Sequence, residues 1–344
     1  MGARAFITGV EGLALTADEQ ALLRDSRPWG LILFRRNVGT PDQIRRLIGS
    51  FRDAVRRDDA PVLIDQEGGR VQRLGPPQWP AYPPGRVYGA LYDQDRQAGL
   101  AAARLGAWLI GSDLADLGIN VDCLPLADVP IAGADAVIGD RAYGNSQDKV
   151  AAIARAVADG LADAGVLPVL KHIPGHGRAN ADSHERLPVV DADREVLEAT
   201  DFKAFRLLAD LPLAMTAHVV YAAIDPVAPA TTSPRMIDEI IRRHIGFDGA
   251  LMSDDVSMGA LSGTLAERTK ASFAAGCDLV LHCNGRFEEM ASVATEAPLL
   301  AGESLRRTEA ALRARKKPVD IDRAAARAEF SAMMARISDS TAAT

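Results

Sequence analysis

Two short segments of the chain carry the residue types that acid–base and nucleophilic chemistry need. Asp182 and His184 are two positions apart, so their side chains lie on the same side of the chain if the segment is extended. A carboxylate beside an imidazole fixes the tautomer of the ring and stabilises its protonated form, which produces a general acid near neutral pH. Asp254 and Asp255 directly follow an apolar run, and at most one of them faces a shared site because successive strand residues point to opposite sides. Spacing alone leaves open which aspartate reacts, or whether one caps the next segment and the other is solvated.

A second group of polar residues suits a ligand that is rich in hydroxyl groups. Asp65 can accept hydrogen bonds from sugar hydroxyls, and lysine and arginine side chains supply charged donors. The cationic members of this group are Arg73, Arg141 and Lys171. The same cations could instead form salt bridges at the rim of a site. Glu67 is interpreted as a structural partner of Arg70 or Arg73 that lies outside the core site.

The elements that must position these groups are short apolar runs, which alternate with longer amphipathic segments along nearly the whole chain. The runs are Ala5–Val10, Gly30–Phe34, Pro61–Asp65, Ile119–Leu126, Val166–His172, Leu213–Val220, Gly249–Ser253 and Cys277–His282. Near-continuous hydrophobicity is typical of parallel strands that are covered on both faces. An open doubly wound sheet would share this alternation, but the chain has no GxGxxG turn or Walker loop, and eight is the strand number of a closed barrel. The sequence therefore predicts an α/β fold, a single (β/α)8 TIM barrel with a long catalytic loop after the fifth strand.

Amphipathic helices are predicted between most of these runs. They are Pro41–Arg57, Gln97–Leu117, Gln147–Ala164, Asp193–Ala209, Pro234–Ile245 and Thr264–Ala275. Thr40 and Ser233 each precede a proline, which is typical of a helix start. The chain has no linker rich in Ser, Gly or Pro and no internal repeat, so residues 1–344 are predicted to form one catalytic domain. From about residue 317 we expect a C-terminal helix, over Arg323–Ile337, and a frayed polar tail.

The histidines gather where a barrel would carry its chemistry. Catalytic groups in such barrels lie at the C-terminal ends of the strands, and five of the six histidines fall at or just beyond predicted strand ends: His172, His176, His184, His218 and His282. One alternative is a metal-dependent hydrolase that uses four of these imidazoles, all except His184. Against it, the first strand ends without the His-x-His pair that such a site would need. A second alternative is a sugar-binding module without catalysis.

Composition and charge restrict the partners of the protein. The formal net charge is −7 and no basic stripe could follow a phosphate backbone, so no nucleic-acid partner is expected. No apolar run reaches the roughly 18 residues of a membrane span, and the N-terminus lacks a signal-peptide pattern. Cys123, Cys277 and Cys283 form no CxxC pair and are interpreted as buried free thiols in a reducing compartment. We therefore expect a cytoplasmic protein, a monomer without membrane association, that acts on a small molecule.

Four motifs of the chain together resemble one enzyme family. The loop Lys171–Gly177, with the Asp-Ser-His of residues 182–184, resembles the signature loop of family 3 glycoside hydrolases of the β-N-acetylglucosaminidase branch. Ile240–Val256, which contains Ser253-Asp254-Asp255, resembles the nucleophile signature of that family. Asp65–Arg73 and Gly139–Arg141 match it as well, and the resemblance covers roughly residues 5 to 300.

The resemblance implies a role for each matching residue. Asp254 falls on the nucleophile, His184 on the general acid/base and Asp182 on its dyad partner. The positions that match sugar-binding residues are Asp65, Arg73, Arg141, Lys171 and His172. No metal or other cofactor is implied.

The same resemblance implies a reaction. It is the retaining removal of terminal β-1,4-linked N-acetylglucosamine from peptidoglycan fragments, the anhydro-muropeptides, through a covalent glycosyl-enzyme. The chain resembles the single-domain cytoplasmic enzymes of peptidoglycan recycling more than the larger secreted β-glucosidases, whose acid residue comes from a second domain. Three alternatives remain: another sugar specificity within the family, phosphate instead of water as acceptor, and attack by the substrate's own acetamide.

Overall fold

The strands of the computed structural model form a closed parallel barrel. Among residues 2–341, which are those that the structure describes, the eight barrel strands follow one another around the ring in the order β1-β12-β11-β9-β7-β6-β3-β2. Their bounds are β1 (Arg4–Thr8), β2 (Pro28–Leu33), β3 (Val62–Ile64), β6 (Val121–Asp122), β7 (Leu167–Ile173), β9 (Leu213–Thr216), β11 (Ala250–Asp255) and β12 (Leu279–His282). Each strand overlaps one of the predicted apolar runs, so the predicted (β/α)8 barrel is confirmed.

Side chains fill the barrel from inside and cover it from outside. One buried cluster occupies the interior and includes Ile7, Leu63, Val169, Met215 and Met252, which come from five different strands. A larger cluster lies between the strands and the surrounding helices. Since every strand is covered on both faces, its sequence is apolar at successive positions instead of alternating. This arrangement leaves the strand ends as the places where polar side chains can meet.

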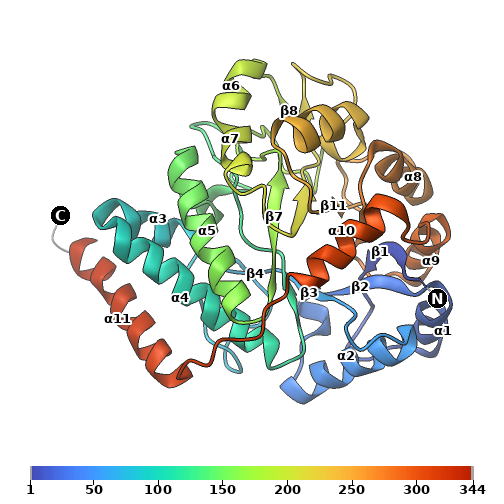
Figure 1. Ribbon diagram of the computed structural model, residues 1–344, viewed down its shortest axis with the longest axis horizontal. Helices are drawn as coiled ribbons and strands as arrows, with labels where there is room; N and C mark the ends of the chain where they lie inside the picture. The colour runs from blue at the N-terminus through green and yellow to red at the C-terminus, as the bar shows by residue number, and fades with distance from the viewer. Residues whose placement is uncertain (1, 342–344) are drawn as a thin grey trace.

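Helices surround the barrel, as the ring in Figure 1 shows. They are α1 (Ala17–Ser26), α2 (Pro41–Val55), α3 (Gly85–Gln94), α4 (Arg96–Ala115), α5 (Gln147–Asp163), α6 (Arg194–Ala199), α7 (Asp201–Arg206), η4 (Met236–His244), α8 (Leu265–Ala275) and α9 (Phe287–Glu296). The predicted start signals are confirmed, because Thr40 accepts a hydrogen bond from the Gln43 N–H at 3.3 Å and Ser233 accepts one from the Met236 N–H at 3.1 Å. These side chains satisfy N–H groups that have no partner inside the helix.

Two predicted helices differ in the structure. The prediction of one helix over Asp193–Ala209 is wrong: α6 ends at Ala199 and α7 begins at Asp201. The Thr200 hydroxyl donates to the Val196 carbonyl at 2.6 Å, and the Arg178 guanidinium donates to the same hydroxyl at 3.0 Å. These local bonds compete with a continuous helix at the junction. The segment predicted as Pro234–Ile245 is η4, a π-helix over Met236–His244.

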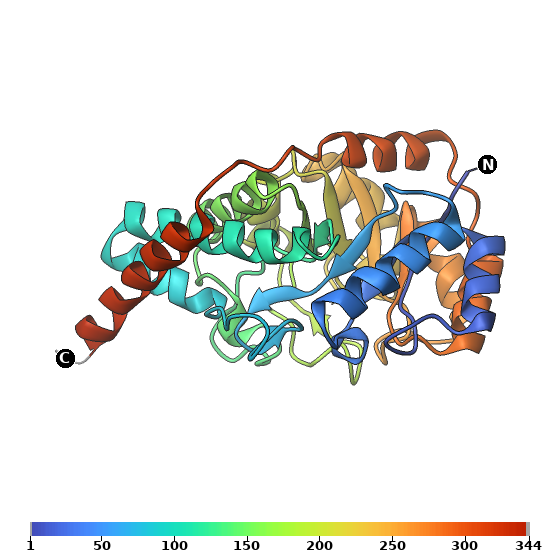
Figure 2. The same cartoon turned by 90° about the horizontal axis from the view of Figure 1, so that it is seen from below.

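Two C-terminal helices complete the described chain. α10 (Gly302–Arg313) lies along the upper edge in Figure 2, across the N-terminal ends of the barrel strands. It is held there by Ser304 and Arg307, which both bind the Asp278 carboxylate beside β12. α11 (Arg323–Thr341) packs against α4 and continues past the predicted end at Ile337. The last residues of the predicted tail, 342–344, lie outside the described residues.

Short elements on the opposite, C-terminal side prepare the site. A β-hairpin of β4 (Gln66–Gly68) and β5 (Val71–Gln72) follows β3 directly. Three short 3-10 turns, η1 (Arg35–Asn37), η2 (Gly139–Arg141) and η3 (Ala230–Thr232), lie in loops after strands. Residues 174–188 follow β7 as turns and irregular chain before β8 (Val189–Val190), which pairs with β10 (Val220–Tyr221).

Candidate active site

A cavity of about 420 Å³ opens at the C-terminal ends of the barrel strands. All eight residues that the sequence singled out for the site line it: Asp65, Arg73, Arg141, Lys171, His172, Asp182, His184 and Asp254. They come from β7, β11 and the loops that follow strands, with Asp65 directly after β3. Parallel strands bring these distant segments together because all their carboxyl ends meet on one face of the barrel.

Asp65 lies at the end of β3 between two cations. Its carboxylate accepts from the Lys171 ammonium and from the Arg73 guanidinium, each at 3.0 Å. Burial by itself raises the pKa of the Asp65 carboxyl, but the two cations lower this pKa by more than burial raises it. The pKa of Asp65 is therefore well below the usual range. Asp65 is therefore ionised and held in place, which leaves its remaining lone pairs for hydroxyl groups of a ligand.

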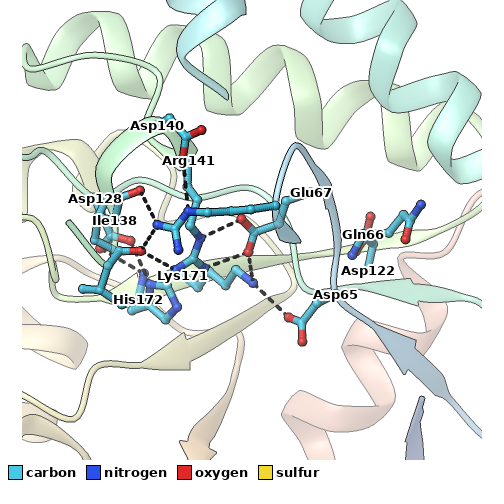
Figure 3. A network of polar contacts seen from close by, with 12 residues as sticks. Asp65, Gln66, Glu67, Asp122, Asp128, Ile138, Asp140, Arg141, Lys171 and His172 are labelled. Atoms are coloured by element: carbon cyan, nitrogen blue, oxygen red, sulfur yellow. Dashed lines mark hydrogen bonds and ion pairs between the residues drawn. The ribbon is translucent and has the colours of Figure 1, made fainter. Parts of the chain in front are cut away.

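Glu67 forms the centre of this charged cluster, and Figure 3 shows it between the Arg141 guanidinium and the Lys171 ammonium. Two parallel bonds of 2.8 Å join it to Arg141, and Lys171 Nζ lies 2.7 Å from its Oε1. The expected pairing with Arg70 or Arg73 is therefore wrong, since Arg70 binds Asp140 at 3.2 Å and Arg73 binds Asp65.

The environment of Glu67 explains why it remains charged. Burial raises the pKa of its carboxyl, but Arg141 and Lys171 lower it to about 2. Burial lowers the pKa of Lys171, but Glu67 and Asp65 raise it above its usual value. The cluster is therefore a set of mutually compensated ions. Glu67 places two donors at the cavity without lining it itself.

Asp128 is a further functional residue, besides Glu67, that the sequence patterns did not assign to the site. Its carboxylate binds His172 Nδ1 at 2.8 Å and accepts from the backbone N–H groups of His172 and His176, at 3.2 and 2.7 Å. Burial raises the pKa of Asp128, but the two neighbouring imidazoles lower it to about 2. The carboxylate fixes the His172 ring so that Nε2 is left for a ligand. A signal was present, since Asp128 stands two positions after the fourth apolar run.

The two adjacent aspartates have different surroundings. Both oxygens of Asp255 are occupied, by the N–H groups of Ser257 and Cys283 at 3.0 and 3.1 Å and by the Ser257 hydroxyl at 2.6 Å. Among the described residues, the Asp254 carboxylate accepts one hydrogen bond, from the Asp255 N–H at 2.8 Å, through its Oδ1. Asp255 is thus a structural carboxylate, and Asp254 is the one that is available to a ligand in the cavity.

The charge state of Asp254 suits a nucleophile. Burial raises the pKa of its carboxyl, but the neighbouring imidazoles of His218 and His172 and the Asp255 N–H lower it below its usual value. The carboxylate is therefore ionised at neutral pH, and in the described part of the chain it is held by one hydrogen bond. An ionised, weakly engaged carboxylate can attack an electrophilic carbon.

Asp182 and His184 meet on the loop after β7, and they do so in a turn instead of an extended segment. Asp182 Oδ1 accepts from the His184 backbone N–H at 2.9 Å and binds its ring Nδ1 at 2.7 Å. The imidazole is 67% exposed and the carboxylate 33%. With Nδ1 engaged, Nε2 is the nitrogen that can exchange a proton with a ligand. The pair therefore has the form of a general acid/base at the mouth of the cavity.

At the strand ends, His218 and His282 use their ring nitrogens for contacts within the protein. His218 binds the Thr231 hydroxyl at 2.7 Å and the Asp255 carbonyl at 3.0 Å. The buried His282 lies 3.4 Å from the Glu289 carboxylate. In the described part of the chain, no group of three or more His, Cys, Asp or Glu side chains is placed to hold a metal ion. Among the residues described, the four histidines of the metal-dependent alternative therefore do not form such a group.

These features define a class of protein: a barrel enzyme that presents one free carboxylate and one carboxylate-bound imidazole to a polar cavity. The comparisons with known proteins agree with this class. The model of the glycosyl hydrolase family 3 N terminal domain matches residues 7–315. The chain therefore belongs to glycosyl hydrolase family 3.

Individual relatives cover most of the chain. A beta-hexosaminidase of Alkalilimnicola ehrlichii is 43% identical over 282 residues, which are 80% of this chain and 79% of the relative. One of Aromatoleum aromaticum is 36% identical over 315 residues, covering 90% and 87%. Among solved structures, NagZ from Neisseria gonorrhoeae in complex with N-trifluoroacetyl-D-glucosamine superposes with a TM-score of 0.84 at 31% identity and 98% coverage of both chains. No helix in the described residues is long and apolar enough to cross a membrane.

Proposed function

We propose that the protein is a retaining exo-β-N-acetylglucosaminidase that uses Asp254 as nucleophile and His184 as general acid/base. The observation that carries this proposal is that a free, ionised carboxylate and a carboxylate-bound imidazole line one cavity. A glycosidase that retains configuration needs one group that attacks the anomeric carbon and one that protonates the leaving oxygen. The names of the relatives, beta-hexosaminidase and NagZ, favour N-acetylglucosamine as the sugar.

In the first step, an Asp254 oxygen forms a bond to the anomeric carbon while the glycosidic C–O bond breaks. Protonated His184 gives its Nε2 proton to the departing oxygen, and the Asp182 carboxylate stabilises the imidazolium through Nδ1. In the second step, neutral His184 takes a proton from water. The water oxygen bonds to the anomeric carbon and Asp254 leaves as a carboxylate.

The charged cluster supports recognition of the sugar. Asp65 and the cations Arg73, Arg141 and Lys171 are fixed by one another and by Glu67 before any ligand binds. We propose that Asp65 accepts from sugar hydroxyls, that the cations donate to sugar oxygens, and that His172 binds a sugar hydroxyl through Nε2, since its Nδ1 is bound to Asp128. Because these groups are already ordered, little side-chain entropy is lost on binding.

The natural substrate that we propose is a peptidoglycan fragment, an anhydro-muropeptide, met in the cytoplasm during cell-wall turnover. The three cysteines are buried free thiols, which fits a reducing compartment. We further propose that the described barrel works as one catalytic domain and as a monomer. No cofactor is needed, since Asp254 and His184 supply both the nucleophile and the proton.

Trapping with a 2-fluoro or 5-fluoro N-acetylglucosaminyl-type donor tests the covalent step, because fluorine slows hydrolysis of the glycosyl-enzyme. Mass spectrometry of peptides should find the sugar on Asp254. If turnover of p-nitrophenyl β-N-acetylglucosaminide proceeds and no peptide is labelled, attack by the substrate's acetamide replaces the proposed mechanism. Kinetics on a muropeptide-derived disaccharide beside the aryl glycoside tests the natural substrate, and adding phosphate tests it as an alternative acceptor.

A further inference from the structure

His176 makes a side-chain contact that the proposed reaction does not use. Its Nε2 lies 3.1 Å from the hydroxyl of Ser183, and both side chains are buried, with 3% of each residue exposed. Ser183 is the residue between Asp182 and His184. A buried hydrogen bond therefore holds the middle of the acid/base segment, whose two flanking side chains are themselves much more exposed.

The other end of this contact is fixed to the barrel. The His176 N–H donates to Asp128 at 2.7 Å, and Asp128 also holds His172. The Gly177 backbone passes so close to the Val129 carbonyl that a Cβ on Gly177 would lie 2.2 Å from its oxygen. Burial and the neighbouring His172 lower the pKa of His176 to about 4, so the ring is neutral in the neutral range. His176 is thus an uncharged anchor, held by its backbone N–H on Asp128 and by its Nε2 on Ser183.

The other contacts of the acid/base segment are made by its backbone. The carbonyls of Ser183 and His184 accept from the Ala260 and Gly259 N–H groups, at 3.2 and 3.3 Å, and the Asp182 carbonyl accepts from the N–H groups of residues 185 and 186, at 3.0 and 3.1 Å. These bonds hold the main chain and do not engage the Ser183 side chain. Among the described contacts of Ser183, the one to His176 is the only side-chain hydrogen bond.

We propose that His176 and Ser183 form a latch that positions the Asp182–His184 pair over the cavity. The inference rests on the proposed role of His184, and it makes both latch residues positioning residues, since neither gives a proton to the substrate. Without the latch, the imidazole spends less time where Nε2 reaches the leaving oxygen. Attack by Asp254 is unaffected, because Asp254 lies on β11 and not on this loop.

The substrate's leaving group separates these effects. An activated aryl group such as 2,4-dinitrophenolate departs without a proton, whereas a sugar or alkyl alcohol needs one. Ser183→Ala should lower kcat/KM for the poor leaving group by about fivefold, the worth of one neutral hydrogen bond. For the activated substrate, kcat/KM should stay within twofold of the wild-type value, roughly the scatter of such measurements.

Matched variants distinguish a latch from general damage. Ser183→Thr keeps the hydroxyl and should restore the wild-type ratio between the two substrates. Ser262→Ala removes an exposed serine from a neighbouring loop and should change neither rate. His176→Gln keeps a polar group near the position of Nε2, whereas His176→Asn does not reach Ser183 and should behave like Ser183→Ala. The double variant that combines His176→Asn with Ser183→Ala should lose no more kcat/KM than either single variant, because both remove the same hydrogen bond.

Each outcome supports or overturns the latch. A loss confined to the poor leaving group, with rescue by threonine, supports it. Equal losses on both substrates, or no loss in Ser183→Ala, overturn it. His184→Ala, measured in parallel, reports on the proposed function separately: if it shows no dependence on the leaving group, His184 is not the acid, whatever Ser183→Ala does.

Discussion

The two halves of the cavity are built differently. Glu67 and Lys171 are buried in a network of ion pairs on β4 and β7, with 4% and 2% of their side chains exposed. Asp182 and His184 form a single pair in a turn, and their side chains are 33% and 67% exposed. One half is fixed by the folded barrel before a ligand arrives, and the other depends on a loop.

This difference assigns different tasks to the two halves. Sugar recognition gains from groups that are already ordered and desolvated, because little has to rearrange on binding. Proton transfer has to approach a leaving oxygen and later a water molecule, so its group must lie near solvent. The buried half should therefore contribute to stability as well as binding, whereas the exposed half should contribute to turnover alone.

The largest expected effect comes from removing the nucleophile. Asp254→Ala should lower kcat for p-nitrophenyl β-N-acetylglucosaminide by on the order of 10⁴-fold or more, because no group remains to form the covalent intermediate. The unfolding temperature should change little, since the Asp254 carboxylate accepts a single hydrogen bond within residues 2–341. Asp254→Asn is the matched control for shape. A variant that keeps a tenth of the wild-type rate would remove Asp254 from this role.

Removal of the imidazole should give the next largest effect. His184→Ala should slow substrates with poor leaving groups by about 10²- to 10⁴-fold, the range of general acid catalysis. Activated aryl glycosides should lose far less in the glycosylation step, since their leaving groups need no proton. Steady-state kinetics over a series of leaving groups measures this dependence. Equal losses across the series would contradict the acid role.

The free energy of unfolding tests the buried half of the cavity. Glu67→Gln should destabilise the protein by about 3 kcal/mol, because it leaves Lys171 and Arg141 buried with less countercharge. Asp140→Asn is the matched control, since its pair with Arg70 is 38% and 48% exposed and should contribute less than about 1 kcal/mol. Urea unfolding measures both variants. Similar small losses for the two would show that the buried cluster contributes no more than a surface pair.

The stability of the fold at low pH should depend on the same Glu67 carboxylate. The pKa of Glu67 falls from 4.5 to about 2 on folding, so its contribution is present above pH 4.5 and is lost as pH falls toward 2. Wild-type stability should therefore decrease over this range more steeply than that of Glu67→Gln. Unfolding temperatures between pH 7 and pH 3 measure the difference. Parallel curves for the two proteins would contradict the assigned shift.

The smallest expected stability effect is in the exposed half. Asp182→Asn should change the free energy of unfolding by less than about 1 kcal/mol, because its ion pair with His184 is largely exposed. Turnover of poor leaving groups should fall nonetheless, since the imidazolium loses its carboxylate partner. A stability loss as large as that of Glu67→Gln would erase the contrast between the two halves.

Hydrophobic patterns and helix start signals within single segments were sufficient to predict most of the fold. The apolar runs located all eight barrel strands, and Thr40 with Pro41 marked the start of α2. The helix predicted over Asp193–Ala209 was wrong because the chain is interrupted at Thr200, whose hydroxyl accepts from Arg178, a residue from another loop. A contact with a side chain from another loop leaves no periodic signal in the segment itself.

Residue types and motif resemblance also identified the lining of the cavity, and the structure brings all eight of those residues together. Residue spacing by itself could not separate Asp254 from Asp255. That choice is visible only where Cys283 and Ser257 occupy the second carboxylate. The partners of Glu67 were also misassigned, because its neighbours in sequence, Arg70 and Arg73, are not its neighbours in space.

The sequence by itself determined the strand pattern, the barrel and the set of polar residues at the strand ends, because burial on two faces dictates residue type locally. Only the tertiary structure decided which charges pair, with Glu67 between Arg141 and Lys171 and Asp128 bound to His172. The physical reason is that ion pairing depends on distances of a few ångströms between strands that lie tens of residues apart in the chain, and closure of the barrel sets those distances.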